Sequence, residues 1–255
     1  MSSLLGPDDP PAYVEIPGAA PILLVCDHAS HRVPRALGGL GLAPKHLGAH
    51  IAWDIGAAEV TRHLAPLLGA MALICGYSRL VVDCNRDPDD PSSMPALSDG
   101  IAIPGNAALS PDARADRLAA IFTPYHAAIA RALDRMRAGG RVPALISIHS
   151  FTPMMDGLAR PWHAGILWDA DGRIAAPLMA ALAAEPGLII GNNQPYSARE
   201  PRGYTVSHHA AAAGLAHVAI ELRQDLVGDA EGAAVWARRL ARVLGPILRA
   251  LGVVN

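Results

Sequence analysis

Ile22-Leu23-Leu24-Val25-Cys26-Asp27-His28-Ala29-Ser30-His31 is the stretch that decides the fold of this chain. Its first five residues are apolar, and Asp27 and His28 follow them directly. A short continuous apolar run that is bounded by turn signals is typical of a strand buried on both faces. Open α/β sheets place their binding crevice at the carboxyl ends of such strands. The stretch therefore predicts a buried strand with a functional site beside His28.

The composition favours a helix-rich α/β protein. The chain has 255 residues, of which 51% are apolar, 17% are charged and 4% are aromatic. Alanine and leucine supply most of the apolar residues, which is more typical of alternating helices and strands than of an aromatic-rich sandwich. The length is sufficient for a full core. We expect a single domain over residues 1–255, in which residues 1–11 are flexible.

Charge and hydropathy argue against several classes of protein. The net charge is −2, with 21 basic and 23 acidic residues and no basic block, so we expect no nucleic-acid or membrane partner. No apolar stretch is long enough to span a bilayer, and Met1 to Pro11 lacks the pattern of a signal peptide. Cys26, Cys75 and Cys84 lie in or beside apolar runs and are interpreted as buried free thiols. We expect a cytoplasmic protein, and the sequence does not predict its oligomeric state.

Predicted strands and helices alternate along the chain. Strands are predicted at Tyr13–Ile16, Ile22–Cys26, Met71–Cys75, Arg79–Val82, Ala144–Ile148, Gly165–Trp168, Leu188–Ile190 and His217–Leu222. Helices are predicted from Asp54 to Gly69, from Ser110 to Gly139, from Arg173 to Ala184 and from Asp229 onward. The strands at Met71–Cys75 and Arg79–Val82 are expected to form a hairpin around Gly76. Residues 87–106 are expected to form a long loop. The alternation predicts a three-layer α/β sandwich, a mixed and mostly parallel sheet with helices on both faces.

Ionisable or polar groups lie at the ends of four of these strands. They are Asp27-His28, Asn85-Arg86, His149-Ser150 and Glu221-Leu222-Arg223. Two histidines and a carboxylate, with a fourth position left to water, form the ligand set of a catalytic zinc site. Zinc lowers the pKa of its bound water to about 7, and a nearby glutamate can take the proton and transfer it to a leaving amine. The pattern indicates a metal-dependent hydrolase.

Each of these residues also has a structural interpretation. A histidine after a buried strand is often a hydrogen-bonded structural residue, and Asp54 is placed where a carboxylate can cap a helix. Glu221 is harder to explain in this way, because an unpaired carboxylate inside an apolar strand is costly. It needs a partner, either Arg223 or a water on a metal. From the residues alone both interpretations stay open.

Four segments of the chain resemble the N-formylglutamate amidohydrolase family. They are Cys26–Ala29, Ser78–Arg86, Ser147–Phe151 and Ile220–Arg223. The matches span about residues 22 to 227 in the order of the family, and the pattern Ser-Arg-x-x-x-Asp-x-Asn-Arg is fairly specific. The resemblance implies a fold similar to that of the zinc carboxypeptidases and aminoacylases. It also implies a zinc amidohydrolase of amino-acid catabolism, which releases formate or another acyl group from an amino acid with free carboxylates.

The resemblance further implies a set of metal ligands. His28 and His149 match the two histidines of the family, and Asp54 falls on its acidic position before a helix. The zinc carboxypeptidases take their second ligand three residues after the first, where this chain has His31. His31 is therefore the fallback ligand if Asp54 only caps its helix. Zn²⁺ is the expected ion, although another divalent metal suits the same ligands.

Catalytic and substrate-binding roles are implied in the same way. Glu221 matches the glutamate that related peptidases and amidases use as general base. Arg86, with Asn85, matches a segment suited to holding a substrate carboxylate, because a guanidinium binds a carboxylate through two parallel hydrogen bonds. Further candidates for the substrate pocket are Arg79, Arg223, His163 and His209.

Three hypotheses of function follow. In the first, the protein hydrolyses the amide bond of a small N-acyl amino acid such as N-formylglutamate with the help of zinc. In the second, the same metal serves a peptidase or an amidase that acts on another amide. In the third, the chain is a catalytically silent α/β binding domain, and the joint presence of His28, His149, Glu221 and Arg86 argues against it. A serine hydrolase is disfavoured because no Gly-x-Ser-x-Gly elbow is present.

Overall fold

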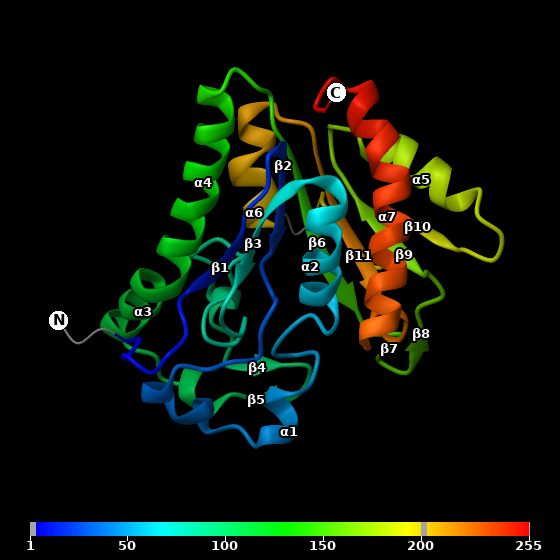
Figure 1. Ribbon diagram of the computed structural model, residues 1–255. Helices are drawn as coiled ribbons and strands as arrows, with labels where there is room; N and C mark the ends of the chain where they lie inside the picture. The colour runs from blue at the N-terminus through cyan, green and yellow to red at the C-terminus, as the bar shows by residue number, and fades with distance from the viewer. Residues whose placement is uncertain (1–3, 200–202, 255) are drawn as a thin grey trace.

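A seven-stranded sheet forms the centre of the computed structural model, which describes residues 4–199 and 203–254 (Figure 1). Its strands are β1 (Tyr13–Ile16), β2 (Ala20–Cys26), β3 (Ala70–Cys75), β6 (Ala144–Phe151), β9 (Ala164–Leu167), β10 (Ile190–Asn192) and β11 (His217–Arg223). They lie in the order β1-β3-β2-β6-β11-β9-β10. Strands β3, β2, β6 and β11 run parallel, whereas β1 and β9 pair antiparallel to β3 and β11. The predicted mixed, mostly parallel sheet is confirmed.

Helices cover both faces of the sheet, as predicted. The helices are α1 (Pro44–Leu47), α2 (Ala57–Leu68), α3 (Pro111–Arg117), α4 (Thr123–Ala138), α5 (Ala175–Ala183), α6 (Tyr204–His209) and α7 (Ala230–Ala250). On one face Leu24 of β2 packs in a core with residues of α2, α5 and α7. On the other face the neighbouring residue Leu23 packs in a second core with Ile129 of α4. Strand β2 is therefore buried on both sides, and the fold is a three-layer sandwich.

Shorter elements complete the described chain. Two small hairpins are formed by β4 (Leu97–Ser98) with β5 (Ile101–Ala102) and by β7 (Met154–Met155) with β8 (Leu158–Ala159). A π-helical turn, Leu118–Phe122, joins α3 to α4. The long loop expected at residues 87–106 thus contains the first of these hairpins. No helix of the described residues has the length and apolar character needed to cross a membrane.

The predicted strand at Arg79–Val82, and with it the hairpin around Gly76, is wrong. The segment is a buried turn whose carbonyl groups accept hydrogen bonds from distant side chains. Asn106 Nδ2 donates to the carbonyl of Leu80, and Arg117 Nη1 donates to that of Val81. A buried apolar run needs partners for its backbone groups, and here side chains supply them in place of a neighbouring strand.

The helix expected to begin at Asp54 begins later. Its N-cap is Gly56, which has a φ of 83° and lies against the backbone of Val227, where a Cβ atom would approach the carbonyl oxygen to 2.2 Å. The turn at Gly56 separates Asp54 from the helix, and no side chain caps α2. Asp54 is therefore not a helix cap, and its carboxylate is available for other partners.

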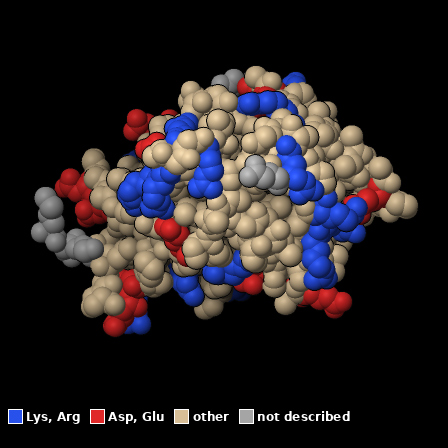
Figure 2. Space-filling model, turned by 45° about the horizontal axis from the view of Figure 1, so that its top comes forward, with Lys and Arg blue, Asp and Glu red and all other residues tan. Residues whose placement is uncertain are grey.

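The surface and the thiols also bear on the sequence-based expectations. On the face shown in Figure 2, basic side chains lie in several separate groups with acidic side chains between them. Cys26, Cys75 and Cys84 are buried and free, which confirms the interpretation as free thiols. Pro10 belongs to the N-terminal segment, and its carbonyl accepts a hydrogen bond from the Tyr77 hydroxyl. The flexibility of residues 1–11 and the single-domain boundary stay predictions.

Candidate active site

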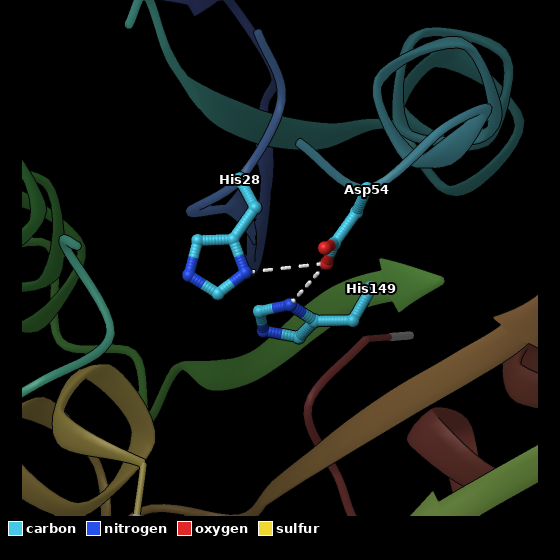
Figure 3. Close-up of side chains that lie close together, drawn as sticks. All are labelled: His28, Asp54 and His149. Carbon is cyan, nitrogen blue, oxygen red and sulfur yellow. Dashed lines mark hydrogen bonds and ion pairs between the residues drawn. The ribbon is translucent and has the colours of Figure 1, made fainter. Parts of the chain in front are cut away.

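Three side chains converge at the carboxyl ends of β2 and β6 (Figure 3). His28 follows β2, His149 lies in β6 and Asp54 lies in the loop before α2. Asp54 Oδ2 is 3.3 Å from His28 Nδ1 and 2.8 Å from His149 Nδ1. All three residues are buried, and their potential ligand atoms lie within 4.8 Å of one another. We call these three residues the metal group, because two histidine nitrogens and a carboxylate oxygen this close together could hold a metal ion.

The second nitrogen of each imidazole faces another carboxylate. His28 Nε2 lies 2.7 Å from Asp83 Oδ1, and His149 Nε2 lies 3.4 Å from Asp27 Oδ2. Carboxylates in this position orient a metal-binding imidazole and fix its tautomer. Both rings therefore present Nδ1 to Asp54, which is the arrangement that a shared cation requires. On these grounds the residues present fit a divalent metal.

The charges in the metal group favour a cation. Burial alone would lower the pKa of His149, but its contacts with Asp27 and Asp54 raise that pKa well above the ordinary value. The pKa of His28 is likewise raised, because Asp83 and Asp54 outweigh burial and the nearby Arg79. Burial would raise the pKa of Asp54, yet the two imidazoles lower it. The protein thus stabilises positive charge where the three side chains meet.

Arg79 completes this network. Its Nη2 lies 2.8 Å from Asp83 Oδ2, and its Nη1 lies 3.6 Å from Asp54 Oδ1. Burial would lower the pKa of Arg79, but the two carboxylates raise it. The guanidinium is therefore committed to the carboxylates that orient and join the histidines, although it also lines the cavity.

Asp27 is held by residues that the sequence did not single out. The Tyr125 hydroxyl donates to Asp27 Oδ1 at 3.0 Å, and the Thr205 hydroxyl donates to the same oxygen at 2.8 Å. These donors come from α4 and α6, which are far from Asp27 in the sequence. No local pattern marks such residues. Held in this way, Asp27 lies beside His149, where its carboxylate can orient the imidazole.

Glu221 stands beside the metal group on the neighbouring strand. It is the register partner of His149 in the β6–β11 pair. Its Oε2 is buried and has no hydrogen-bond partner among the described residues. Burial raises the pKa of Glu221 to about 7, against the effect of the nearby His149. A carboxyl oxygen without a partner, next to a cavity, is suited to receive a proton from a bound water or substrate.

A cavity of about 1310 Å³ opens over this group. The metal group, Glu221, Arg79, Asn85 and Arg86 are among the residues that line it. In the part of the chain that the structure describes, the side chain of Arg86 has no ion pair or hydrogen bond. The Asn85 amide oxygen accepts from the backbone N–H of Thr205 and ties this loop to α6. Arg86 is therefore free to bind an anion.

Arg223 and His163 are not among the residues that line the cavity. The Arg223 guanidinium pairs with Asp225 at 2.8 Å and also donates to the carbonyl of Pro161. His163 Nδ1 accepts from the backbone N–H of Ile189. Both side chains thus tie loops together. The described ion-pair partner of Arg223 is therefore Asp225 and not Glu221.

His209 and His31 also lie outside the described cavity lining. His209 is buried against His126, with 2.9 Å between His209 Nε2 and His126 Nδ1. His31 is exposed, and its ring packs edge-on against Trp53. The backbone turns after His28, so the residue three positions later points away from the metal group. Asp54 occupies the position for which His31 was the fallback.

The chain is similar to known proteins in sequence and in structure. The model of the family described as N-formylglutamate amidohydrolase matches residues 20–227. Over 201 residues the chain is 28% identical to an N-formylglutamate deformylase from Pseudomonas aeruginosa. The aligned residues cover 72% of this chain and 74% of that protein.

Two solved structures are similar over almost their whole length. A gene product from Agrobacterium tumefaciens is 35% identical, with a TM-score of 0.93 over 98% of this chain and 99% of that chain. An N-formylglutamate amidohydrolase from Ralstonia eutropha JMP134 is 20% identical, with a TM-score of 0.66 over 94% of this chain and 96% of that chain. The second likeness shows a shared fold.

Proposed function

Since this chain belongs to the N-formylglutamate amidohydrolase family and is thus an amidohydrolase, we propose that it hydrolyses the amide bond of N-formylglutamate or a related N-acyl amino acid with a divalent metal, zinc in the first place. The observation that carries the metal is the convergence of both imidazole Nδ1 atoms on Asp54 Oδ2. The substrate rests on the names of the relatives. The cytoplasmic location and the oligomeric state stay predictions.

In this proposal His28, Asp54 and His149 hold the metal. The ion, when bound, polarises the acyl oxygen and lowers the pKa of water. Glu221 takes a proton from the attacking water on its unpartnered Oε2 and transfers it to the leaving amine nitrogen. Its pKa of about 7 suits both steps, because the carboxyl group then accepts and releases a proton near neutrality.

The same proposal gives the basic residues separate tasks. Arg86 binds the carboxylate of the amino acid, since its side chain lines the cavity and makes no hydrogen bond or ion pair with the described residues. Asn85 fixes the backbone beside Arg86 through its bond to Thr205. Arg79 keeps Asp54 and Asp83 in place. We do not include Arg223, His163 or His209 among the groups that contact substrate.

In the second hypothesis the same metal acts on another amide substrate. It differs from the first hypothesis only in the substrate group that Arg86 contacts. An amidase or an endopeptidase would accept substrates without a free carboxylate near the cleaved bond, whereas the proposed enzyme would not. The third hypothesis, a silent binding domain, does not agree with membership of an amidohydrolase family.

The test is metal analysis of the purified protein, followed by turnover of N-formylglutamate with and without a chelator. We expect Glu221→Gln to keep the metal and to lose about 10²–10⁴-fold in kcat, because the base is removed and the ligands are not. Glu231→Gln, at the exposed start of α7, is the matched control. Bound metal without turnover would exclude the named substrate. A folded protein without metal affinity would exclude the mechanism.

A further inference from the structure

The cavity is larger than N-formylglutamate requires. Its volume of about 1310 Å³ exceeds the roughly 300–1,000 Å³ of pockets that hold drug-sized ligands. The formyl group is the smallest acyl group, with one carbon atom. Most of this volume therefore lies beyond what the formyl group and the glutamate can fill.

Part of the extra volume follows the cavity-facing side of β11. Glu221, Ala219 and His217 alternate along this strand and line the cavity, whereas Val218 and Ile220 between them face the core. At about 3.3 Å per residue, His217 lies about 13 Å from Glu221. Ala219 is half-buried although β11 lies inside the sheet, between β6 and β9, because the cavity opens above it.

The walls of this space are small or apolar. Leu167 and Trp168, at the end of β9, line the cavity on one side, and Ala212 and Leu215, after α6, line it as well. We call the space bounded by these four residues, Ala219 and His217 the β11 trough. The methyl group of Ala219 forms the floor of the trough. The middle of the trough therefore suits an uncharged chain that makes no ion pairs.

The far end of the trough is polar. His217 Nδ1 lies 2.7 Å from the carbonyl oxygen of Leu215, so Nδ1 carries the hydrogen and donates it. Nε2 is then available for a ligand. Nearby, Arg173 pairs with Asp171 at 2.8 Å and donates to the carbonyl of Gly214. The end of the trough thus offers hydrogen-bonding groups, among them the carboxylate of Asp171, whose Oδ2 lies 3.5 Å from His217 Nδ1. Asp169 also lines the cavity.

The order of the strands sets the direction in which a substrate lies. Arg86 follows Asp83, whose carboxylate contacts His28 after β2. The trough begins at Glu221 on β11, and β6 with His149 lies between β2 and β11. A substrate with its carboxylate at Arg86 and its amide at the metal group therefore directs its acyl group towards the trough.

We propose that the β11 trough is an acyl-chain subsite, and that this enzyme hydrolyses N-acyl amino acids whose acyl group is an uncharged chain of several carbons with a polar end at His217. The inference rests on the proposed function and names its substrate class. The reaction stays a hydrolysis. Water breaks the bond between the acyl carbon and the amide nitrogen. The acyl carbon gains the hydroxyl group of the water, and the leaving amine nitrogen gains its remaining proton.

The test compares kcat/KM for N-formyl-, N-acetyl-, N-hexanoyl- and N-(hydroxyhexanoyl)-glutamate, the last with a terminal hydroxyl. We expect the wild type to prefer the two longer chains to the formyl group, and the terminal hydroxyl to improve turnover further. Ala219→Leu fills the floor of the trough. It should lower kcat/KM for both long substrates by tenfold or more, since one or two carbons in an apolar pocket have this effect, while formyl turnover changes less than twofold.

A second variant guards against a folding defect in the strand. Ala212→Phe narrows the trough from an exposed turn and should reproduce the selective loss. Ala213→Phe is its matched control, because Ala213 is the next residue of the same turn and is absent from the described lining. This control should leave all four substrates unchanged.

The outcomes distinguish a failure of the acyl-chain subsite from a failure of the proposed function. Turnover of N-formylglutamate without turnover of either long chain would overturn the subsite and leave the proposed function intact. If no substrate is turned over, the proposed function fails, and binding of N-hexanoylglutamate measured by calorimetry tests the subsite alone. Loss of that binding in Ala219→Leu would support the trough, and equal binding in both proteins would overturn it.

Discussion

In the described part of the chain two buried pairs of histidines differ in their electrostatics. The rings of His28 and His149 have centroids 5.0 Å apart, and those of His126 and His209 are 5.2 Å apart. All four residues are buried. Nevertheless the pKa of each imidazole is raised in the first pair and lowered in the second. Burial and spacing therefore do not decide what a histidine pair does.

The partners of the nitrogens explain the difference. In the first pair Asp54 joins the two Nδ1 atoms, and Asp83 and Asp27 face the two Nε2 atoms. Four nitrogens thus meet carboxylates, which favour a positive charge. Such a pair is prepared for protons or for a metal ion.

The second pair meets neutral groups. His126 Nε2 lies 2.8 Å from the carbonyl oxygen of Cys84, so it donates there, and Nδ1 must accept the hydrogen of His209 Nε2. Burial lowers the pKa of His126 to about 4, and burial with the neighbouring His126 lowers that of His209 to about 4. Two neutral imidazoles in one hydrogen-bonded chain hold α6 against α4 and have no place for a cation.

The largest expected effect separates the two pairs by metal binding. His149→Ala should remove the metal and lower kcat by at least about 10³-fold, because one of three ligands is lost. His209→Gln should keep the metal and most of the activity. Metal analysis and turnover of both purified variants make the comparison. Loss of metal in His209→Gln would contradict the division between the pairs.

The next effect concerns the carboxylates that distinguish the pairs. Asp83→Asn leaves the ligands in place but removes the charge that orients His28 Nε2. We expect metal affinity to fall about 10–100-fold, as for other residues that orient a metal ligand. Asp134→Asn, on the exposed face of α4, serves as the control. Titration with a competing chelator measures both; an unchanged affinity in Asp83→Asn would remove Asp83 from this role.

The smallest effect is on the pH dependence of stability. Because the folded pKa of His126 and His209 is about 4, against about 6.5 in the unfolded chain, only the unfolded chain takes up these protons as the pH falls from 6.5 towards 4. The contribution of this pair to the free energy of unfolding should therefore decrease by about 1–2 kcal/mol between pH 7 and pH 5, after allowance for solvent screening. The raised pKa values of His28, His149 and Glu221 act in the opposite direction in the metal-free protein.

Urea unfolding of the metal-free wild type and of the double variant His126→Gln/His209→Gln at the two pH values isolates this contribution. The change in unfolding free energy between pH 7 and pH 5 should differ between the two proteins by that amount, because glutamine does not titrate. A double variant with the same pH dependence as the wild type would show that this pair is not its source.

Much of the fold follows from local patterns. The apolar runs at Ile22–Cys26, Ala144–Ile148 and His217–Leu222 predict buried strands, and the structure confirms all three. The same pattern failed at Arg79–Val82, where Asn106 and Arg117 supply the backbone partners from a distance. An apolar run reports burial, whereas the partner of a buried backbone group depends on the rest of the chain.

By itself the sequence determined the alternating sheet and helices and placed His28, His149 and Glu221 on strands that share an edge, because burial and strand alternation depend on neighbouring residues. Only the tertiary structure decided that Asp54, and not His31, joins the two imidazoles. It also decided that His209 meets another histidine and not the cavity. The charge that an imidazole carries depends on groups within a few ångströms in space, and those groups come from segments far apart in the chain.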